Sequence, residues 1–308
     1  MKVIVSAVAF SKNKELVNKL LVFFPDAVLN TEGMRYSRQE LITYYKDADA
    51  IITGLEKIDE ALLNHLPKLK IISKYGVGLD NIDLVACANR NIKIGWTPGV
   101  NKNSVAEMAL GFMIMLCRNL YTTSNQLKNN NWNKNGGVSL QNKTVGIIGL
   151  GHIGKELARL LQPFGVKIIA NDIISQNNSE QYGIKMVEFE ELIRKSDIIS
   201  LHTPLDNTTL NLIDKESIEL MKDGVILINT ARGGIINEND LKNYLKSGKI
   251  GGAALDVYSM EPPEDYELLK HENLITTPHI AGNSYEAVLA MGLEAIDHLV
   301  KFNSKQSN

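Results

Sequence analysis

Short apolar runs alternate with amphipathic segments in the first hundred residues. Four runs have the length and the β-branched content of buried strands. They are Lys2–Ala7, Asp49–Thr53, Leu69–Lys74 and Ile92–Gly95. Helix-like segments lie between them, for example Lys14–Phe23 and Asp59–His65. Because strands that alternate with helices are typical of a parallel sheet covered by helices, this pattern predicts an α/β unit.

The same alternation begins again near Lys143. Six further strand-like runs follow: Thr144–Gly149, Lys167–Asn171, Asp197–His202, Val225–Thr230, Gly252–Val257 and Asn273–Thr276. A turn-rich stretch, Trp96–Asn101, separates the two series and leads into an apolar helix, Val105–Leu116. We expect Ser104 and Glu107 to form a capping box at the start of that helix. The pattern therefore predicts a second α/β unit, and the chain would pass from the first unit to the second at this turn-rich stretch.

Two units also suit the chain length, because 308 residues exceed the roughly 250–300 at which one core usually splits. We expect the last helix, about Tyr285–Phe302, to return the chain to the first unit. The predicted fold is therefore α/β, with two Rossmann-like or flavodoxin-like domains, parallel sheets and a cleft between the domains. The first domain would comprise residues 1–100 and 283–308, and the second residues 101–282.

Composition narrows the function classes. Hydrophobic residues make up 44% of the chain and charged ones 22%, and the net charge is only −2, so nucleic acid is not an expected partner. The apolar helix is shorter than the ~20 residues that cross a bilayer, and no export signal is visible, so we expect no membrane partner and a cytoplasmic location. Cys87 and Cys117 lie in apolar stretches and are expected to be buried, reduced thiols.

A glycine fingerprint, Gly149-Leu150-Gly151-His152-Ile153-Gly154, follows the first strand of the second series and opens a helix-like segment. The pattern alone is weak, but this strand–loop–helix context is typical of dinucleotide binding. Gly149 would permit the turn, Gly151 would let the backbone approach a pyrophosphate, and Gly154 would let helix and strand pack closely. We therefore expect a nucleotide cofactor at this loop.

An acidic residue, Asp172, ends the next strand, 18 residues beyond Gly154. This spacing is close to the ~20 residues at which a carboxylate binds the ribose hydroxyls, where it would repel a 2′-phosphate. No arginine occurs in Ile173–Gln176, so we expect NAD as the cofactor rather than NADP. An ordinary turn carboxylate is the alternative.

Three polar residues follow strand ends of the second series: Arg232, Glu261 and His279. The carboxyl edge of an open α/β sheet is where ligands bind. A guanidinium suits a carboxylate ligand, and a histidine paired with a carboxylate suits proton transfer near neutral pH. Spacing does not establish contact, so a surface arginine and a structural histidine remain alternatives. No Cys or second His lies at ligand spacing from His65, His271 or His298, so we expect no metal site.

Five phrases together resemble the D-isomer-specific 2-hydroxyacid dehydrogenase family. They are Gly76–Asp83, Asn142–Gly149, Thr230–Gly234, Gly252–Val257 and Pro278-His279, in the order of that family. The resemblance extends from about Leu69 to Glu286. It implies hydride transfer between C4 of a nicotinamide and C2 of a 2-hydroxy or 2-oxo acid.

The resemblance also implies roles for individual residues. His279 would transfer the proton, and Glu261 would hold and tune His279. Arg232 would bind the substrate carboxylate. Gly76, Val77 and Gly78 would bind the same carboxylate through their backbone, and Asn103 would line the cleft. The residues that would contact the cofactor are Gly149, Gly151, His152, Ile153, Gly154, Asp172, His202, Thr203, Pro204, Thr230, Ala231, Asp256, His279 and Gly282. A homodimer is expected by the same analogy.

Within the family, the residues around Gly76–Asp83 and Ala231–Pro263 most resemble the 3-phosphoglycerate branch, which begins serine synthesis. Lys74 and Lys134 are candidate partners for a phosphate, or else surface lysines. Hydroxypyruvate, glyoxylate and bulkier 2-oxo acids remain open as substrates. A non-catalytic NAD-binding corepressor-like scaffold is the alternative of another class, although the set of Arg232, Glu261 and His279 argues against it. Glu261 argues against a formate-type dehydrogenase, because enzymes of that type typically pair their histidine with a glutamine.

Overall fold

The computed structural model describes residues 1–174 and 183–306, which form two compact units. Unit 1 comprises Met1–Asn101 and the chain from Tyr285 onward, and unit 2 comprises Lys102–Ser284. Each unit contains one sheet in which every pair of neighbouring strands is parallel. The prediction of two α/β domains with parallel sheets is therefore confirmed.

The sheet of unit 1 has the strand order β2-β1-β3-β4-β5, which is the flavodoxin-like order. Its strands are β1 (Val3–Val5), β2 (Val28–Leu29), β3 (Ala50–Thr53), β4 (Ile71–Lys74) and β5 (Lys93–Gly95). Its helices are α1 (Val8–Lys12), α2 (Lys14–Phe23), α3 (Arg38–Tyr45), α4 (Glu60–Leu63), α5 (Leu84–Asn89) and α13 (Tyr285–Gln306).

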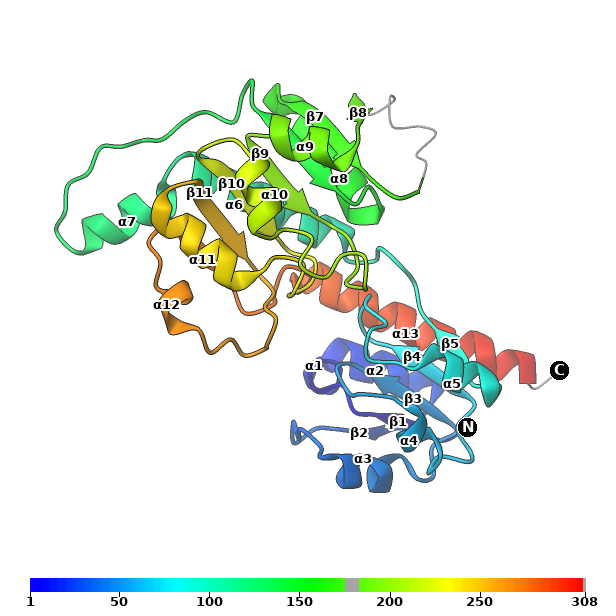
Figure 1. Cartoon of the computed structure of the whole chain (residues 1–308). Coiled ribbons are helices and arrows are strands. Elements are labelled where there is room, and N and C mark those ends of the chain that lie inside the picture. Colours follow the sequence, from blue (N-terminus) through cyan, green and yellow to red (C-terminus); the bar gives the residue numbers. More distant parts are fainter. Residues whose placement is uncertain (175–182, 307–308) are drawn as a thin grey trace. The chain divides into compact units, whose positions relative to one another are not determined.

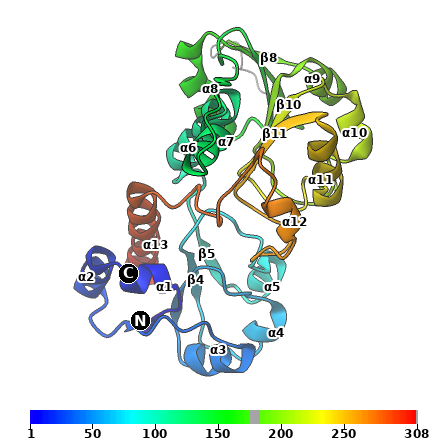
Figure 2. The ribbon, with the colours of Figure 1, turned by 90° about the vertical axis from the view of Figure 1, so that its left-hand side faces the viewer.

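Helices cover both faces of this sheet, with α1, α2 and α13 on one face and α3, α4 and α5 on the other (Figure 2). Successive strand residues point to opposite faces, so Val3 and Val5 join the core beneath α2 and α13, while Ile4 joins the core on the other face. On α2, Leu16 and Leu20 are spaced one helical turn apart and both are buried. The continuous apolar runs of the sequence are thus strands buried on both faces.

The sheet of unit 2 has the strand order β12-β11-β10-β9-β6-β7-β8, which is the Rossmann order with a seventh strand added. Its strands are β6 (Thr144–Ile148), β7 (Lys167–Asn171), β8 (Ile184–Met186), β9 (Ile198–Leu201), β10 (Val225–Asn229), β11 (Ile250–Leu255) and β12 (Leu274–Thr276). Its helices are α6 (Lys102–Cys117), α7 (Leu120–Lys128), α8 (His152–Leu161), α9 (Phe189–Lys195), α10 (Lys215–Leu220), α11 (Glu238–Ser247) and α12 (Tyr266–Leu269), with a 3₁₀ turn at Gln162–Phe164.

In this unit α6 and α8 cover one face of the sheet, and α9, α10 and α11 cover the other (Figures 1 and 2). The strand order reverses between β6 and β9, which pair directly. In open α/β sheets the crevice at such a reversal, beyond the carboxyl ends of the strands, is the usual place for a ligand. The glycine fingerprint follows β6 at this point.

Two short strands and one cap differ from the expectations. β2 and β8 have two and three residues, too few to show a periodic signal, and neither was predicted. The capping box at Ser104 and Glu107 was wrong, because α6 already begins at Lys102 and Ser104 lies inside it. The Ser104 hydroxyl instead donates to the carbonyl oxygen of Ala281 at 2.6 Å and accepts from the Ser284 backbone N–H at 3.2 Å.

Both cysteines are buried and neither forms a disulfide. Burial raises the pKa of the Cys87 thiol to about 11, so the thiol stays protonated at neutral pH. Among residues 1–174 and 183–306, no helix combines the length and the apolar character needed to cross a membrane.

The C-terminal helix α13 completes the core of unit 1, and its contribution can be measured. Leu299 is fully buried in that core, whereas Leu293 on the same helix is 37% exposed. We expect Leu299→Ala to lower the free energy of unfolding by about 2–5 kcal/mol, because it removes buried methyl groups and leaves a cavity. Urea denaturation followed by tryptophan fluorescence measures this. Leu293→Ala is the matched control, and equal losses in the two variants would contradict the assigned packing.

Candidate active site

The loop after β6 and the loop after β9 lie against each other. Gly149 has a φ of +91°, and a Cβ placed on it would lie 2.6 Å from the carbonyl oxygen of His202. A side chain there would face both a strained backbone conformation and a clash, so the turn requires glycine. This contact places the fingerprint at the reversal of strand order.

The other two glycines of the fingerprint differ in their surroundings. A Cβ on Gly154 would lie 2.2 Å from the carbonyl oxygen of Gly149, so this glycine lets α8 pack closely on β6. A Cβ on Gly151 would meet nothing within 4 Å. Gly151 is the N-cap of α8, and no side chain caps that helix. The first turn of α8 therefore presents backbone N–H groups and a positive dipole end, which suit a pyrophosphate.

Asp172 holds the fingerprint loop in place. Its Oδ2 accepts from the Leu150 backbone N–H at 2.6 Å, and its Oδ1 accepts from the Ile174 backbone N–H at 2.8 Å. Each carboxylate oxygen has a further lone pair that can accept from a ribose hydroxyl. Residues 175 and 176, on which the argument for NAD also depends, lie outside the described residues.

Buried polar atoms without partners gather after β9 and β10. The hydroxyl oxygens of Thr203 and Thr230 and Nδ1 of His202 have no hydrogen-bond partner within the described residues. Such atoms are uncommon in folded proteins and indicate a missing ligand or water. His202 Nε2 and the Ser200 hydroxyl are 2.9 Å apart, and burial lowers the pKa of His202 to about 3, so its ring stays neutral.

The remaining expected cofactor residues are placed less specifically. His152 and Pro204 are exposed, whereas Ile153 and Gly282 are half-buried. Ala231 is buried in the core, and its backbone N–H donates to Asn229 Oδ1 at 3.0 Å. Their contacts with a cofactor remain predictions.

Arg232 follows β10 in a segment packed on the chain after β11. Its side chain is half-buried and donates to the carbonyl oxygen of Ala231 at 2.7 Å, and its own carbonyl oxygen accepts from Asn229 Nδ2 at 2.8 Å. A Cβ on the next residue, Gly233, would lie 1.9 Å from the backbone of Tyr258. Gly233 therefore lets the two backbones touch, a role that the sequence did not reveal.

Glu261 and His279 are in direct contact. His279 Nδ1 lies 2.8 Å from Glu261 Oε2, and Glu261 Oε1 accepts from the Tyr258 backbone N–H at 3.1 Å. Because an ionised carboxylate can only accept, Nδ1 carries the hydrogen and Nε2 is left for another partner. The two side chains are 46% and 39% exposed, so a ligand can reach them.

The backbone of His279 is in the left-handed region, with a φ of +55°. This conformation is uncommon outside glycine and is often found at functional sites. The loop that carries His279 is held by Asp256, which is fully buried. Asp256 Oδ1 accepts from the Thr277 hydroxyl at 2.6 Å and the Ile280 N–H at 2.8 Å, and Oδ2 accepts from the Ala281 N–H at 2.8 Å. Sequence reasoning assigned Asp256 to the cofactor and missed this contact.

In unit 1, Gly76, Val77 and Gly78 follow β4 in a half-buried loop, and Gly76 has a φ of +135°. Lys74, the candidate phosphate partner, is only 7% exposed, and its Nζ donates to the carbonyl oxygen of Gly54 and to Asn81 Oδ1. It therefore joins two loops within unit 1 and is not a surface lysine. Asn103, at the start of α6 in unit 2, is exposed.

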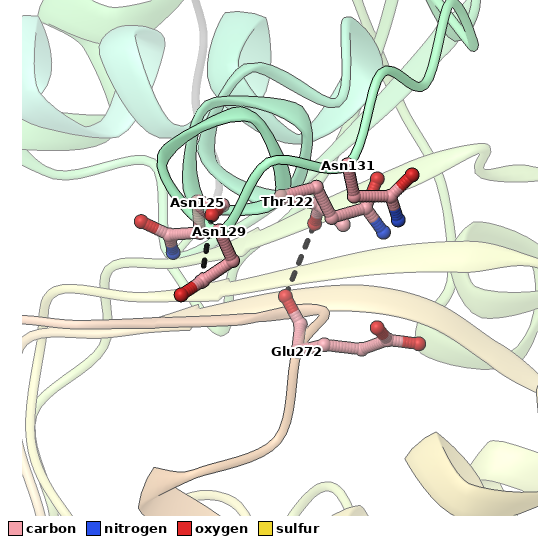
Figure 3. Close-up of a pocket in the computed structure, with 6 residues that line it drawn as sticks. Thr122, Asn125, Asn129, Asn131 and Glu272 are labelled. Atoms are coloured by element: carbon pink, nitrogen blue, oxygen red, sulfur yellow. Dashed lines mark hydrogen bonds between the residues drawn. The ribbon is translucent and has the colours of Figure 1, made fainter.

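A separate small pocket of 230 Å³ lies between α7 and the turn before β12 (Figure 3). The residues that line it include Asn125 and Asn129, and the Thr122 hydroxyl donates to the carbonyl oxygen of Glu272 at 3.1 Å. Glu272 precedes β12, so this pocket lies at the amino end of that strand. The fingerprint and His279 follow the carboxyl ends of strands, so the pocket is not part of the candidate site.

Comparisons with known proteins found one matching family profile and similar sequences. The profile of the family described as D-isomer specific 2-hydroxyacid dehydrogenase, NAD binding domain, matches residues 110–281. The D-3-phosphoglycerate dehydrogenase of Archaeoglobus fulgidus is 40% identical over 86% of this chain and 51% of its own length. The hydroxypyruvate reductase of Thermotoga maritima is 38% identical over 89% of this chain and 90% of its own length.

A solved structure, that of the D-lactate dehydrogenase from Aquifex aeolicus complexed with NAD and lactic acid, has a TM-score of 0.85. It is 28% identical and the match covers 99% of this chain and 96% of that chain.

The fold and the fingerprint define a protein with an NAD-binding Rossmann domain. More narrowly, the chain belongs to the D-isomer-specific 2-hydroxyacid dehydrogenase family, as the resemblance in its sequence implied. The chain spans about half the length of the D-3-phosphoglycerate dehydrogenases that it matches, and 90% of the hydroxypyruvate reductase.

Substitutions of Gly154 and Gly151, at the start of α8, allow the effect on protein stability to be measured separately from the effect on cofactor binding. We expect Gly154→Ala to destabilise unit 2 by about 1–3 kcal/mol, because the added methyl group forces α8 away from β6. Gly151→Ala meets no protein atom, so it should retain the melting temperature and weaken NADH binding. Thermal unfolding and NADH fluorescence titration measure the two effects. Unchanged NADH affinity in Gly151→Ala would contradict a pyrophosphate at this turn.

The lowered pKa of the half-buried His202 predicts a pH dependence of stability. Because the folded protein keeps the ring neutral down to about pH 3, whereas an unfolded histidine is protonated below about 6.5, stability falls as the pH drops below about 6.5. At pH 5 this effect amounts to about 2 kcal/mol relative to pH 7. We expect His202→Gln to lose correspondingly less stability between these pH values in urea denaturation. An NMR titration of folded protein with a His202 midpoint near pH 6.5 would contradict the assignment.

Proposed function

We propose that this protein is an NAD-dependent dehydrogenase of D-2-hydroxy acids. The observation that carries the proposal is the contact between Glu261 and His279, 2.8 Å apart in the unit that holds the fingerprint. Glu261 holds Nδ1, so Nε2 of His279 is available to the substrate oxygen. In the reducing direction His279 gives a proton to the C2 carbonyl oxygen, and in the oxidising direction it takes the proton from the hydroxyl.

The carboxylate of the substrate, which is bonded to C2, requires hydrogen-bond donors other than His279. We assign this role to the guanidinium of Arg232 and to the backbone N–H groups of Gly76, Val77 and Gly78. A guanidinium binds a carboxylate through two parallel hydrogen bonds, and it also polarises the neighbouring carbonyl. Asn103 is assigned to the same substrate.

The residues around the fingerprint fit NAD. The N-terminus of α8, which no side chain caps, would hold the pyrophosphate, and Asp172 would bind the ribose. The hydroxyls of Thr203 and Thr230, which have no partner within the described residues, would bind the remaining polar groups of the cofactor. When bound, NAD supplies C4 of its nicotinamide as the acceptor or donor of the hydride. Glu261 fixes the orientation of the histidine ring while the proton moves at Nε2.

The substrate that we propose first is 3-phosphoglycerate, with hydroxypyruvate and glyoxylate as alternatives. The 40% identity to a D-3-phosphoglycerate dehydrogenase and the residues around Gly76–Asp83 support this order. Since Lys74 is engaged within unit 1, a phosphate would need another cation, for which exposed Lys134 remains a candidate.

We also propose a cytoplasmic homodimer that acts in serine synthesis. The support for this proposal is the family resemblance.

A panel of substrates tests the function. We expect NADH oxidation with at least one of phosphohydroxypyruvate, hydroxypyruvate, glyoxylate, pyruvate and branched 2-oxo acids. His279→Ala should lower kcat by about 10²–10⁴-fold, because it removes the proton donor, while NADH still binds. The measurement is the decrease of NADH absorbance under saturating substrate.

His65→Ala, at an exposed position in unit 1, is the matched control and should keep full activity. Absence of turnover with every acid would refute the dehydrogenase and leave the non-catalytic scaffold. A strong preference for NADPH would instead contradict only the role of Asp172.

A further inference from the structure

The loop Gly76–Gly78 presents a row of unused donors. Within the described residues, the backbone N–H groups of Gly76, Val77 and Gly78 donate to no protein acceptor. Successive backbone N–H groups in a turn can bind an anion, and Gly76, with a φ of +135°, lets this loop turn as few other residues would. The direction of each N–H group therefore decides whether the loop can bind a carboxylate.

Both ends of this loop are fixed by neighbouring backbone. At its start, the Tyr75 N–H donates to the carbonyl oxygen of Thr53 at 2.9 Å. Beyond it, Asn81 is held through its carbonyl oxygen, which accepts from the Ile58 N–H at 2.7 Å, and through Nδ2, which donates to the carbonyl oxygen of Glu56 at 2.6 Å. None of these bonds sets the orientation of the peptide groups in the middle of the loop.

The side chain of Trp96 reaches the middle of the loop. The indole Nε1–H of Trp96 donates to the carbonyl oxygen of Val77 at 2.7 Å. Trp96 directly follows β5, which pairs with β4, so the donor comes from the neighbouring strand end. In a trans peptide group the C=O and the N–H point in opposite directions, so a bond to the Val77 carbonyl oxygen also fixes the direction of the Gly78 N–H.

Both neighbours of Trp96 in the chain contact α13. Gly95 before it lies against His298, where a Cβ would be 2.6 Å from the Cβ of that residue. Thr97 after it donates to Glu294 Oε2 at 2.7 Å and lies 2.9 Å from His298 Nε2, and both partners are on α13. Trp96 is 37% exposed, so burial in a core does not explain its position.

We propose that Trp96 is a positioning residue for substrate binding, which orients the Val77–Gly78 peptide group so that the Gly78 N–H faces the substrate carboxylate. This inference rests on the proposed function, because it assigns the carboxylate to this loop. An indole N–H can only donate, and its planar ring holds that donor in one direction. Trp96 thus acts on the substrate through the backbone and does not touch the reacting atoms.

Trp96→Phe removes the donor and keeps an aromatic ring. We expect the KM for the 2-oxo acid to rise roughly 3- to 10-fold, as for the loss of one hydrogen bond, while kcat at saturating substrate and the Kd for NADH stay within about twofold. Trp132→Phe is the matched control, because Trp132 is 75% exposed and lies in unit 2. An unchanged KM in Trp96→Phe, or a loss confined to kcat, would overturn the proposal.

A second measurement leaves Trp96 intact. The chain has two tryptophans, so the Trp132→Phe protein reports on Trp96 alone. We expect its emission to change saturably when oxalate, a carboxylate probe, is titrated in the presence of NAD⁺, and not with sodium chloride at equal ionic strength. No response to oxalate would refute the proposal even if Trp96→Phe failed to fold. If the unmodified protein turned over no 2-oxo acid, the proposed function would fail, whereas normal turnover with no effect at Trp96 would refute this inference alone.

Discussion

The site of this protein depends on one buried carboxylate, that of Asp256. Burying a carboxylate away from water costs free energy unless several hydrogen-bond donors replace the water. Here a hydroxyl and two backbone N–H groups of residues 277–281 donate to Asp256. These donors lie on both sides of His279 in the chain, so they hold that residue in its left-handed conformation. The imidazole then meets Glu261, which the Tyr258 backbone N–H holds in turn. The acid–base pair is thus fixed by a group that need not touch substrate.

Arg232 joins this arrangement through backbone packing. Gly233, the next residue, lies so close to the Tyr258 backbone that only a hydrogen atom fits between them. The segment that carries the guanidinium and the segment that leads to Glu261 therefore pack backbone against backbone. Backbone packing at Tyr258 and the hydrogen bonds of Glu261 thus connect the three catalytic candidates, although they lie on three different loops after β10, β11 and β12. Rigid support of this kind is what a proton-transfer site requires.

Much of the fold could be predicted because the strands buried on both faces appear as continuous apolar runs, and because Gly149, Gly151 and Gly154 occupy spacings that a turn and a helix start impose. β2 and β8 could not be predicted, since two or three residues show no period. The partners of Ser104, Lys74 and Asp256 were also beyond reach. Ser104 bonds to a residue 177 positions away, and a pattern read along the chain contains no information on such contacts.

The helix α13 belongs to unit 1 although it follows all of unit 2 in the chain. Leu299 and Ala295 fill the core against Leu16 and Val5, which are separated from them by more than the whole length of unit 2. A ribosome makes unit 2 before it makes α13, so unit 2 has all its residues while the core of unit 1 still lacks one layer. The first segment of unit 1 is therefore made before unit 2, but its core can be completed only after unit 2 has been made. During synthesis, one apolar face of the unit 1 sheet stays uncovered until α13 has been made. Exposed apolar surfaces of this kind are those that chaperones protect.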